Sequence, residues 1–168
     1  MEPKEIENFF LKAYEEYSDA IFRYSYYKTS NRELARDLTQ ETFMRSFDYL
    51  NQGKAIQNVR PFLYKTASNL IIDWYKKKKD KSVSLEALEE EGFQVKEVTA
   101  RTPLFNAEAS EIIQVIEKLG TSYRDVIMMR YIGDLKLKEI AVALGEKENV
   151  ISVRIHRGLK KLREILKQ

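Results

Sequence analysis

The sequence predicts an all-α protein of two small helical domains joined by an acidic linker, with a helix-turn-helix in the C-terminal domain. Apolar residues recur at helical spacing along most of the chain, and no stretch alternates with a period of two. The 168 residues suffice for one ordinary domain or two small ones. Hydrophobic residues make up 43% of the chain, which argues against native disorder.

Three helices are predicted in the N-terminal part. The first covers about residues 4–28, and Asn31 is suited to cap a second helix that reaches about Leu50. Pro61 fits the first turn of a third helix, which is expected to end in the lysine run Lys76–Lys79. The inward stripe of this third helix is Leu63, Ala67, Leu70, Ile71 and Trp74.

The middle of the chain is predicted to be a linker over residues 81–106. Helical periodicity is lost there, and Gly92 and Pro103 interrupt the segment. Between residues 82 and 110 there are six glutamates and only two basic residues. The predicted domains are therefore residues 1–80 and 107–168.

Four helices are expected after the linker. The first carries Ile112, Ile113, Ile116 and Leu119, and Thr121 is expected to cap the second. Gly133 and Asp134 then turn the chain.

The segment from Leu137 to Arg163 has the pattern of a helix-turn-helix. Ala141 is small enough for a close helix crossing, Gly145 suits the turn, and Ile151 and Ile155 return to the core. The second helix would then present Ser152, Arg154 and Arg157 to a DNA major groove. An ordinary αα-hairpin with a solvated basic face is the alternative.

Two other features can be explained either by DNA binding or by a simpler structural role. The run Lys76–Lys79 follows Trp74 and Tyr75, which combines phosphate-seeking charge with rings for an unstacked base. The simpler explanation is a helix end favoured by its dipole, beside a core tryptophan. His156 has no partner for a metal site and is expected to lie at the surface or to face DNA.

Composition and motifs argue against several other classes of protein. The chain has no cysteine and one histidine, which excludes a disulfide framework and a thiolate zinc site. No phosphate loop, nucleophile elbow or zinc-protease motif occurs, so we expect no catalysis, no metal and no cofactor. The acidic start has no signal-peptide pattern and no window is apolar enough for a membrane helix, which predicts a cytoplasmic protein.

Three stretches, in this order and at this spacing, resemble the extracytoplasmic-function sigma factors of bacterial RNA polymerase. They are ARDLTQETFMRSF (Ala35–Phe47), PFLYKTASNLIIDWYKKKK (Pro61–Lys79) and the segment Tyr123–Arg163 with YRDVIMMRYIGDLKLKEIAVALG and VRIHRGLKKLR. The resemblance covers nearly the whole chain except the linker. It implies an N-terminal module that docks on core RNA polymerase and melts the minus-ten promoter element, and a C-terminal module that reads the minus-thirty-five element.

The resemblance also implies roles for individual residues. The polymerase-docking surface would comprise Asp37, Leu38, Gln40 and Glu41. The minus-ten DNA would contact Asn58, Phe62, Asn69, Asp73, Trp74, Lys76, Lys77, Lys78 and Lys79, with one base flipped from the stack into a protein pocket. The minus-thirty-five DNA would contact Lys147, Asn149, Ser152, Arg154, His156, Arg157 and Lys160.

Partners follow from the same resemblance. They are core RNA polymerase, promoter DNA and an anti-sigma factor, often membrane-bound, with no small-molecule substrate. The chain departs from the family pattern at Glu146 and Glu148, where apolar residues are usual, and at Val150 and Ser152. Acids in the first turn suit a helix dipole but face phosphates poorly.

Two other functions fit part of the sequence. A dimeric helix-turn-helix regulator would need a dimerisation face, and a helical protein-interaction module would show no salt-dependent DNA affinity. The stretch Ala35–Phe47 separates the first of these from a sigma factor, because a dimeric regulator has no reason to carry it.

Overall fold

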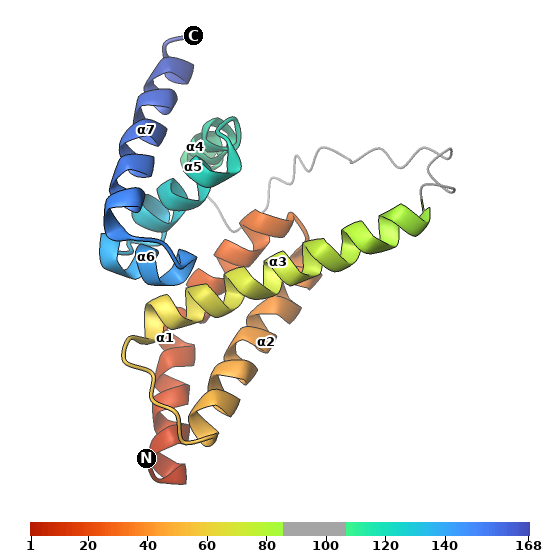
Figure 1. The fold of residues 1–168 in the computed structure, drawn as a ribbon, viewed down its shortest axis with the longest axis vertical. Coiled ribbons are helices and arrows are strands. Elements are labelled where there is room, and N and C mark those ends of the chain that lie inside the picture. Colours follow the sequence, from red (N-terminus) through yellow and green to blue (C-terminus); the bar gives the residue numbers. More distant parts are fainter. Residues whose placement is uncertain (86–106) are drawn as a thin grey trace. The chain divides into compact units, whose positions relative to one another are not determined.

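A computed structural model of the chain describes residues 1–85 and 107–168, and within these ranges every regular element is a helix (Figure 1). The all-α prediction is therefore confirmed. Most of the predicted linker lies outside the described residues. The chain forms two compact units. Among the described residues, the first comprises 1–56 and 66–85, and the second comprises 57–65 and 107–168.

The first unit is built on α1 (Pro3–Thr29) and α2 (Arg32–Asn51), which are joined by a tight turn. The side chain of Asn31 accepts a hydrogen bond from the backbone N–H of Leu34 at 3.0 Å, so this predicted cap is confirmed. Aromatic rings hold the two helices together: the ring centroid of Phe10 lies 5.0 Å from that of Phe47, and Tyr14 lies 4.9 Å from Phe43.

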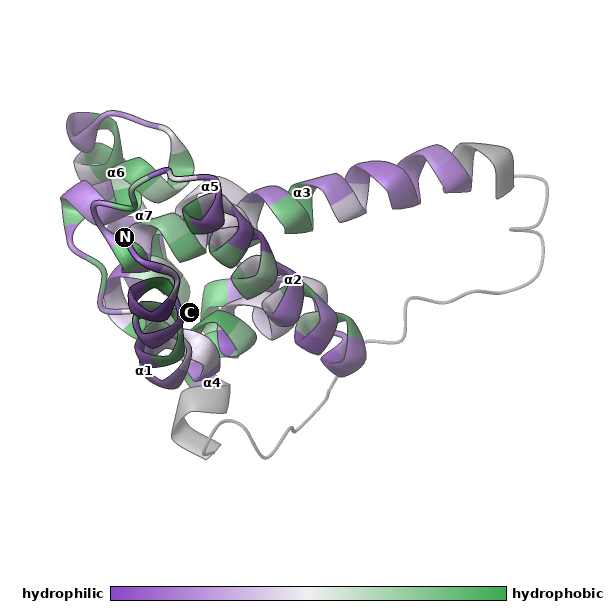
Figure 2. Ribbon diagram, turned by 90° about the horizontal axis from the view of Figure 1, so that it is seen from below, coloured by the Kyte–Doolittle hydropathy of each residue, from purple (hydrophilic) through white to green (hydrophobic). Residues whose placement is uncertain are grey.

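Helix α3 (Val59–Leu85) continues past the lysine run at which the sequence predicted its end. Lysine is a good helix former, and no glycine or proline follows until Gly92. Ala67, Leu70 and Ile71 are buried, and the Tyr75 hydroxyl donates to the carbonyl of Lys28 in α1 at 2.6 Å. Figure 2 shows that the C-terminal part of α3 is mostly hydrophilic.

The C-terminal helices are α4 (Ala107–Glu117), α5 (Thr121–Ile127), the π-helical turn η1 (Met128–Ile132), α6 (Leu137–Leu144) and α7 (Glu148–Leu166). Their fully buried side chains include Val126, Ile127, Met129, Leu135, Ile140 and Ile151. The sequence did not predict η1, in which the N–H of Gly133 bonds to the carbonyl of Met128 at 2.9 Å.

One prediction for this part of the chain was wrong. Thr121 is the first residue of α5 and Gly120 takes the capping position, without a side-chain bond. Ile112 is 58% exposed, whereas Ile116, one turn further along α4, is buried.

Helices α6 and α7 form the predicted helix-turn-helix. Gly145 has φ of +66°, a left-handed conformation that favours glycine, and it ends α6. Ile151 and Ile155 are buried as expected. Gly158 lets α7 approach α5 closely, since a Cβ at this position would lie 3.2 Å from Cγ1 of Ile127.

No helix within the described ranges is both long enough and apolar enough to cross a bilayer.

Candidate nucleic-acid interface

Helix α7 carries the polar and basic face expected of a DNA-reading helix. Its buried positions, Ile151, Ile155 and Gly158, all face the core of the unit. Six predicted DNA-contacting side chains are exposed to solvent: Lys147, Asn149, Ser152, His156, Arg157 and Lys160. The seventh, Arg154, is half-buried. The structure therefore brings this predicted set onto one helix and its N-terminal turn.

Arg154 is engaged by an acid from the turn before α7. Its Nη2 lies 3.0 Å from Oε1 of Glu146, and the two side chains are 27% and 38% exposed. The sequence marked both residues but not their pairing, because a turn interrupts the helix between them and spacing alone does not predict the contact.

A second ion pair joins the start of α3 to α6 within the second unit. Arg60 Nη2 donates to Glu139 Oε2 at 2.7 Å, and Arg60 Nε donates to Oε1 at 3.2 Å. Glu139 also accepts the backbone N–H of Lys136 at 2.7 Å and so caps α6. The two residues are 79 positions apart, and no local signal in the sequence predicts this contact.

The environment of Glu139 favours its ionised form. Burial of the side chain would raise the pKa, but the hydrogen bonds from Arg60 and from the Lys136 backbone, with the charges of both residues, lower the pKa of Glu139 below its usual value of 4.5. A bidentate arginine contact of this kind fixes orientation as well as charge.

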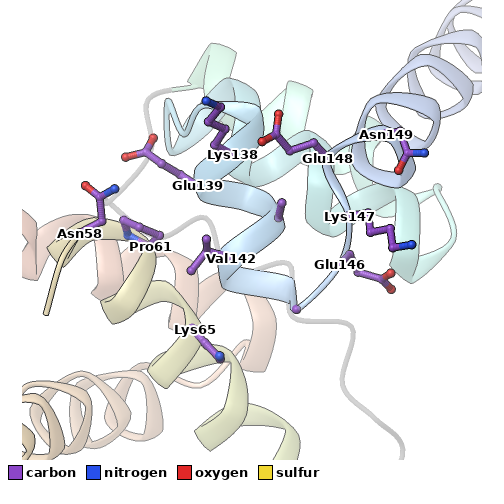
Figure 3. Close-up of a pocket in the computed structure, with 12 residues that line it drawn as sticks. Asn58, Pro61, Lys65, Lys138, Glu139, Val142, Glu146, Lys147, Glu148 and Asn149 are labelled. Carbon is purple, nitrogen blue, oxygen red and sulfur yellow. The ribbon is translucent and has the colours of Figure 1, made fainter.

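A pocket of about 900 Å³ lies beside this ion pair (Figure 3). Asn58, just before α3, and Pro61 and Lys65 of α3 line it. Helix α6 contributes Lys138, Glu139, Ala141 and Val142. The turn before α7 and the start of that helix complete the lining with Gly145, Glu146, Lys147, Glu148 and Asn149. Asn58, predicted for the minus-ten element, thus lies at the same pocket as Lys147 and Asn149, predicted for the minus-thirty-five element.

The remaining predicted minus-ten residues lie on α3. Asn69, Asp73 and the lysine run Lys76–Lys79 are exposed, whereas Phe62 and Trp74 are half-buried. The Trp74 and Tyr75 rings meet edge-on, with their centroids 4.9 Å apart. The ammonium of Lys78 lies 5.0 Å from the centroid of the Trp74 ring. The tryptophan is therefore not the fully buried core residue of the simpler explanation.

The predicted polymerase-docking residues occupy α2 and do not form a single exposed set. Asp37 and Gln40 are exposed, and Glu41 is half-buried and pairs with Arg45 at 2.7 Å. Leu38 is only 7% exposed, so it packs in the core and can support this face only from beneath.

Comparison with known proteins matches two parts of the chain to protein families. Residues 13–81 match the family "Sigma-70 region 2" and residues 109–162 match "Sigma-70, region 4". The ECF RNA polymerase sigma factor SigW of Bacillus subtilis is 33% identical over 159 residues, which are 90% of this chain and 85% of the relative. BldN of Streptomyces coelicolor, also an ECF RNA polymerase sigma factor, is 27% identical over 165 residues, which are 94% of this chain and 60% of the relative.

Two solved structures share the fold. The sigma factor RpoE, in complex with the anti-sigma factor NepR from Bartonella quintana, matches with a TM-score of 0.72 at 16% identity, covering 94% of this chain and 96% of that one. CnrH, in complex with the cytosolic domain of CnrY, matches with a TM-score of 0.68 at 19% identity, covering 96% of this chain and 89% of that one.

Proposed function

The chain belongs to the extracytoplasmic-function sigma factors of bacterial RNA polymerase. From this membership we propose which of its surfaces bind core RNA polymerase and which bind promoter DNA. It is an alternative sigma factor that directs transcription initiation. The family acts without catalysis, and we assign no reaction and no cofactor to this member. Its place of action is the cytoplasm, where its polymerase is.

One observation carries the proposal for the DNA: a basic, exposed face on the second helix of a helix-turn-helix, within the region 4 match. Helix α7 would read the minus-thirty-five element through base edges and phosphates. Arginine and asparagine suit base edges, and lysines suit phosphates.

Helix α3 supplies the second DNA surface. Exposed Asn69 and Asp73 and the lysine run lie on one long helix within the region 2 match. We assign this surface to the minus-ten element, with the half-buried Trp74 beside the strand that opens. An aromatic ring next to several cations suits an unstacked base and its phosphate.

Helix α2 is proposed to dock on core RNA polymerase through Asp37, Gln40 and Glu41, supported from the core by Leu38. A partner anti-sigma factor is also proposed, since RpoE was solved in complex with the anti-sigma factor NepR and CnrH in complex with the cytosolic domain of CnrY.

The test is capture of core RNA polymerase by the tagged chain, followed by run-off transcription on genomic fragments. Transcripts that start at shared upstream elements and that depend on the added chain would support the proposal. Binding to duplex DNA without any dependence on polymerase would favour the dimeric regulator instead.

A further inference from the structure

The turn of the helix-turn-helix places a carboxylate against an arginine of the reading helix. The 3.0 Å contact between Glu146 Oε1 and Arg154 Nη2 spans eight residues, from the turn to the second turn of α7. Both side chains are only partly exposed, so the contact is less screened than one between two fully solvated side chains.

Arg154 lies where a DNA contact would form. It lines a pocket of about 380 Å³ with Asn149 and Arg157 from α7 and with Ser122 and Tyr123 from the start of α5. Arg157 is exposed at the same pocket, and within the described part of the chain no ion pair involves it. The two arginines therefore differ in one respect that matters for DNA: one already has a carboxylate partner.

That difference changes what each arginine gains from a phosphate. Non-specific affinity comes from neutralising phosphates and releasing their counterions. An arginine whose charge is already balanced by a nearby carboxylate gains less electrostatic attraction from a phosphate and releases less of its counterion atmosphere, so its net gain is small. A guanidinium has five N–H donors, and one bond to Glu146 leaves others for the O6 and N7 acceptors of a guanine.

We propose that Glu146 is a positioning residue that makes Arg154 a selective contact. It holds the guanidinium and screens it from phosphates, so that Arg154 adds to affinity mainly where the groove presents a paired acceptor edge such as guanine. The inference rests on the proposed function, because it requires that α7 read the upstream element.

The experiment compares two duplexes of equal length, one carrying the upstream element of a promoter identified by run-off transcription and one with that element scrambled. Glu146→Gln should raise affinity for the scrambled duplex about threefold and make the slope of log affinity against log salt steeper by about one. Affinity for the promoter duplex should rise less, so the ratio between the two duplexes should fall.

Glu148→Gln is the matched control. It removes the same charge from the first turn of α7, where no ion pair is formed among the described residues. It should change both duplexes by the same factor and leave their ratio unchanged. On an Arg154→Ala background, Glu146→Gln should behave like this control, since the coupling needs both partners.

Two results would overturn the inference. Equal effects of Glu146→Gln and Glu148→Gln on the ratio would reduce Glu146 to one negative charge among several. A ratio that still falls when Glu146→Gln is made on the Arg154→Ala background would show that the pairing with Arg154 is not the cause. A parent chain that does not prefer the promoter duplex at all, even with core polymerase present, would instead refute the proposed function. An unchanged melting temperature in every variant separates these effects from misfolding.

Discussion

Glu139 is the residue whose charge state the structure biases most clearly. Its pKa is lowered in the folded chain, chiefly because hydrogen bonds from Arg60 and the Lys136 backbone outweigh the opposing effect of burial. A depressed carboxyl pKa contributes stability that is complete above the unfolded-state value and is lost as the pH falls through the folded-state value. We therefore expect the parent to lose stability as the pH falls below the usual glutamate value of 4.5, in part through this group.

Glu139→Gln should remove that part of the pH dependence, measured by thermal melts across the same range. Arg60→Ala supplies the control, because Glu139→Gln should change the pH dependence less once the donor is gone. If Glu139→Gln melts with the same pH dependence as the parent, the ion pair contributes nothing to stability.

At the scale of elements, the crossing of α5 and α7 depends on the absence of a side chain at Gly158. A Cβ there would lie 3.2 Å from Cγ1 and 3.4 Å from Cδ1 of Ile127, which is itself 2% exposed. Gly158→Leu should therefore cost on the order of 1–3 kcal/mol of unfolding free energy, since the core has no room to repack. Glu164→Leu places the same side chain on an exposed position of α7 and should leave the denaturant midpoint nearly unchanged.

Helix α3 is expected to act after the polymerase has bound. Asn69→Ala and Trp74→Ala should impair strand opening more than formation of the closed complex, because a flipped base can be held only once the stack is broken. Permanganate footprinting measures the opening directly. A pre-melted bubble template should rescue both variants, and a failure of that rescue would place the defect elsewhere.

Helices were the part of the structure that the sequence predicted best, because long apolar stripes and caps such as Asn31 are local signals. The turn at Gly145 was predictable for the same reason. The π-helical turn η1 and the approach of Arg60 to Glu139 were not, since one alters hydrogen bonding without a distinctive residue type and the other joins distant parts of the chain. The set proposed to contact DNA followed from the resemblance, but the half-buried, paired state of Arg154 could not be predicted, because a turn separates it from Glu146.

At the scale of the whole molecule, the docking face proposed on α2 would make promoter recognition dependent on another protein. Glu41→Lys should lower affinity for core RNA polymerase, since a charge reversal turns an attractive or neutral contact into a repulsive one. It also breaks the exposed pair with Arg45, which is worth at most about 1 kcal/mol. Competition against the parent chain for core enzyme is the measurement.

Glu15→Lys on α1 is the control for the change in net charge, because Glu15 is exposed and belongs to no predicted surface. It should compete as well as the parent. Equal competition by folded Glu41→Lys would remove the docking role from this face, whereas failure of the parent to bind core polymerase would contradict the assignment of function itself.

Trp74 also makes the chain its own optical reporter. It is the only tryptophan among 168 residues, it is half-buried on α3, and a lysine ammonium and a tyrosine ring already lie within 5.0 Å of its ring centre. Its emission therefore reports on one small region of the protein without any attached dye. A base stacking on that ring would displace water and quench the signal. With excitation that selects tryptophan, stopped-flow fluorescence could follow strand capture in real time without a contribution from the ten tyrosines and eight phenylalanines.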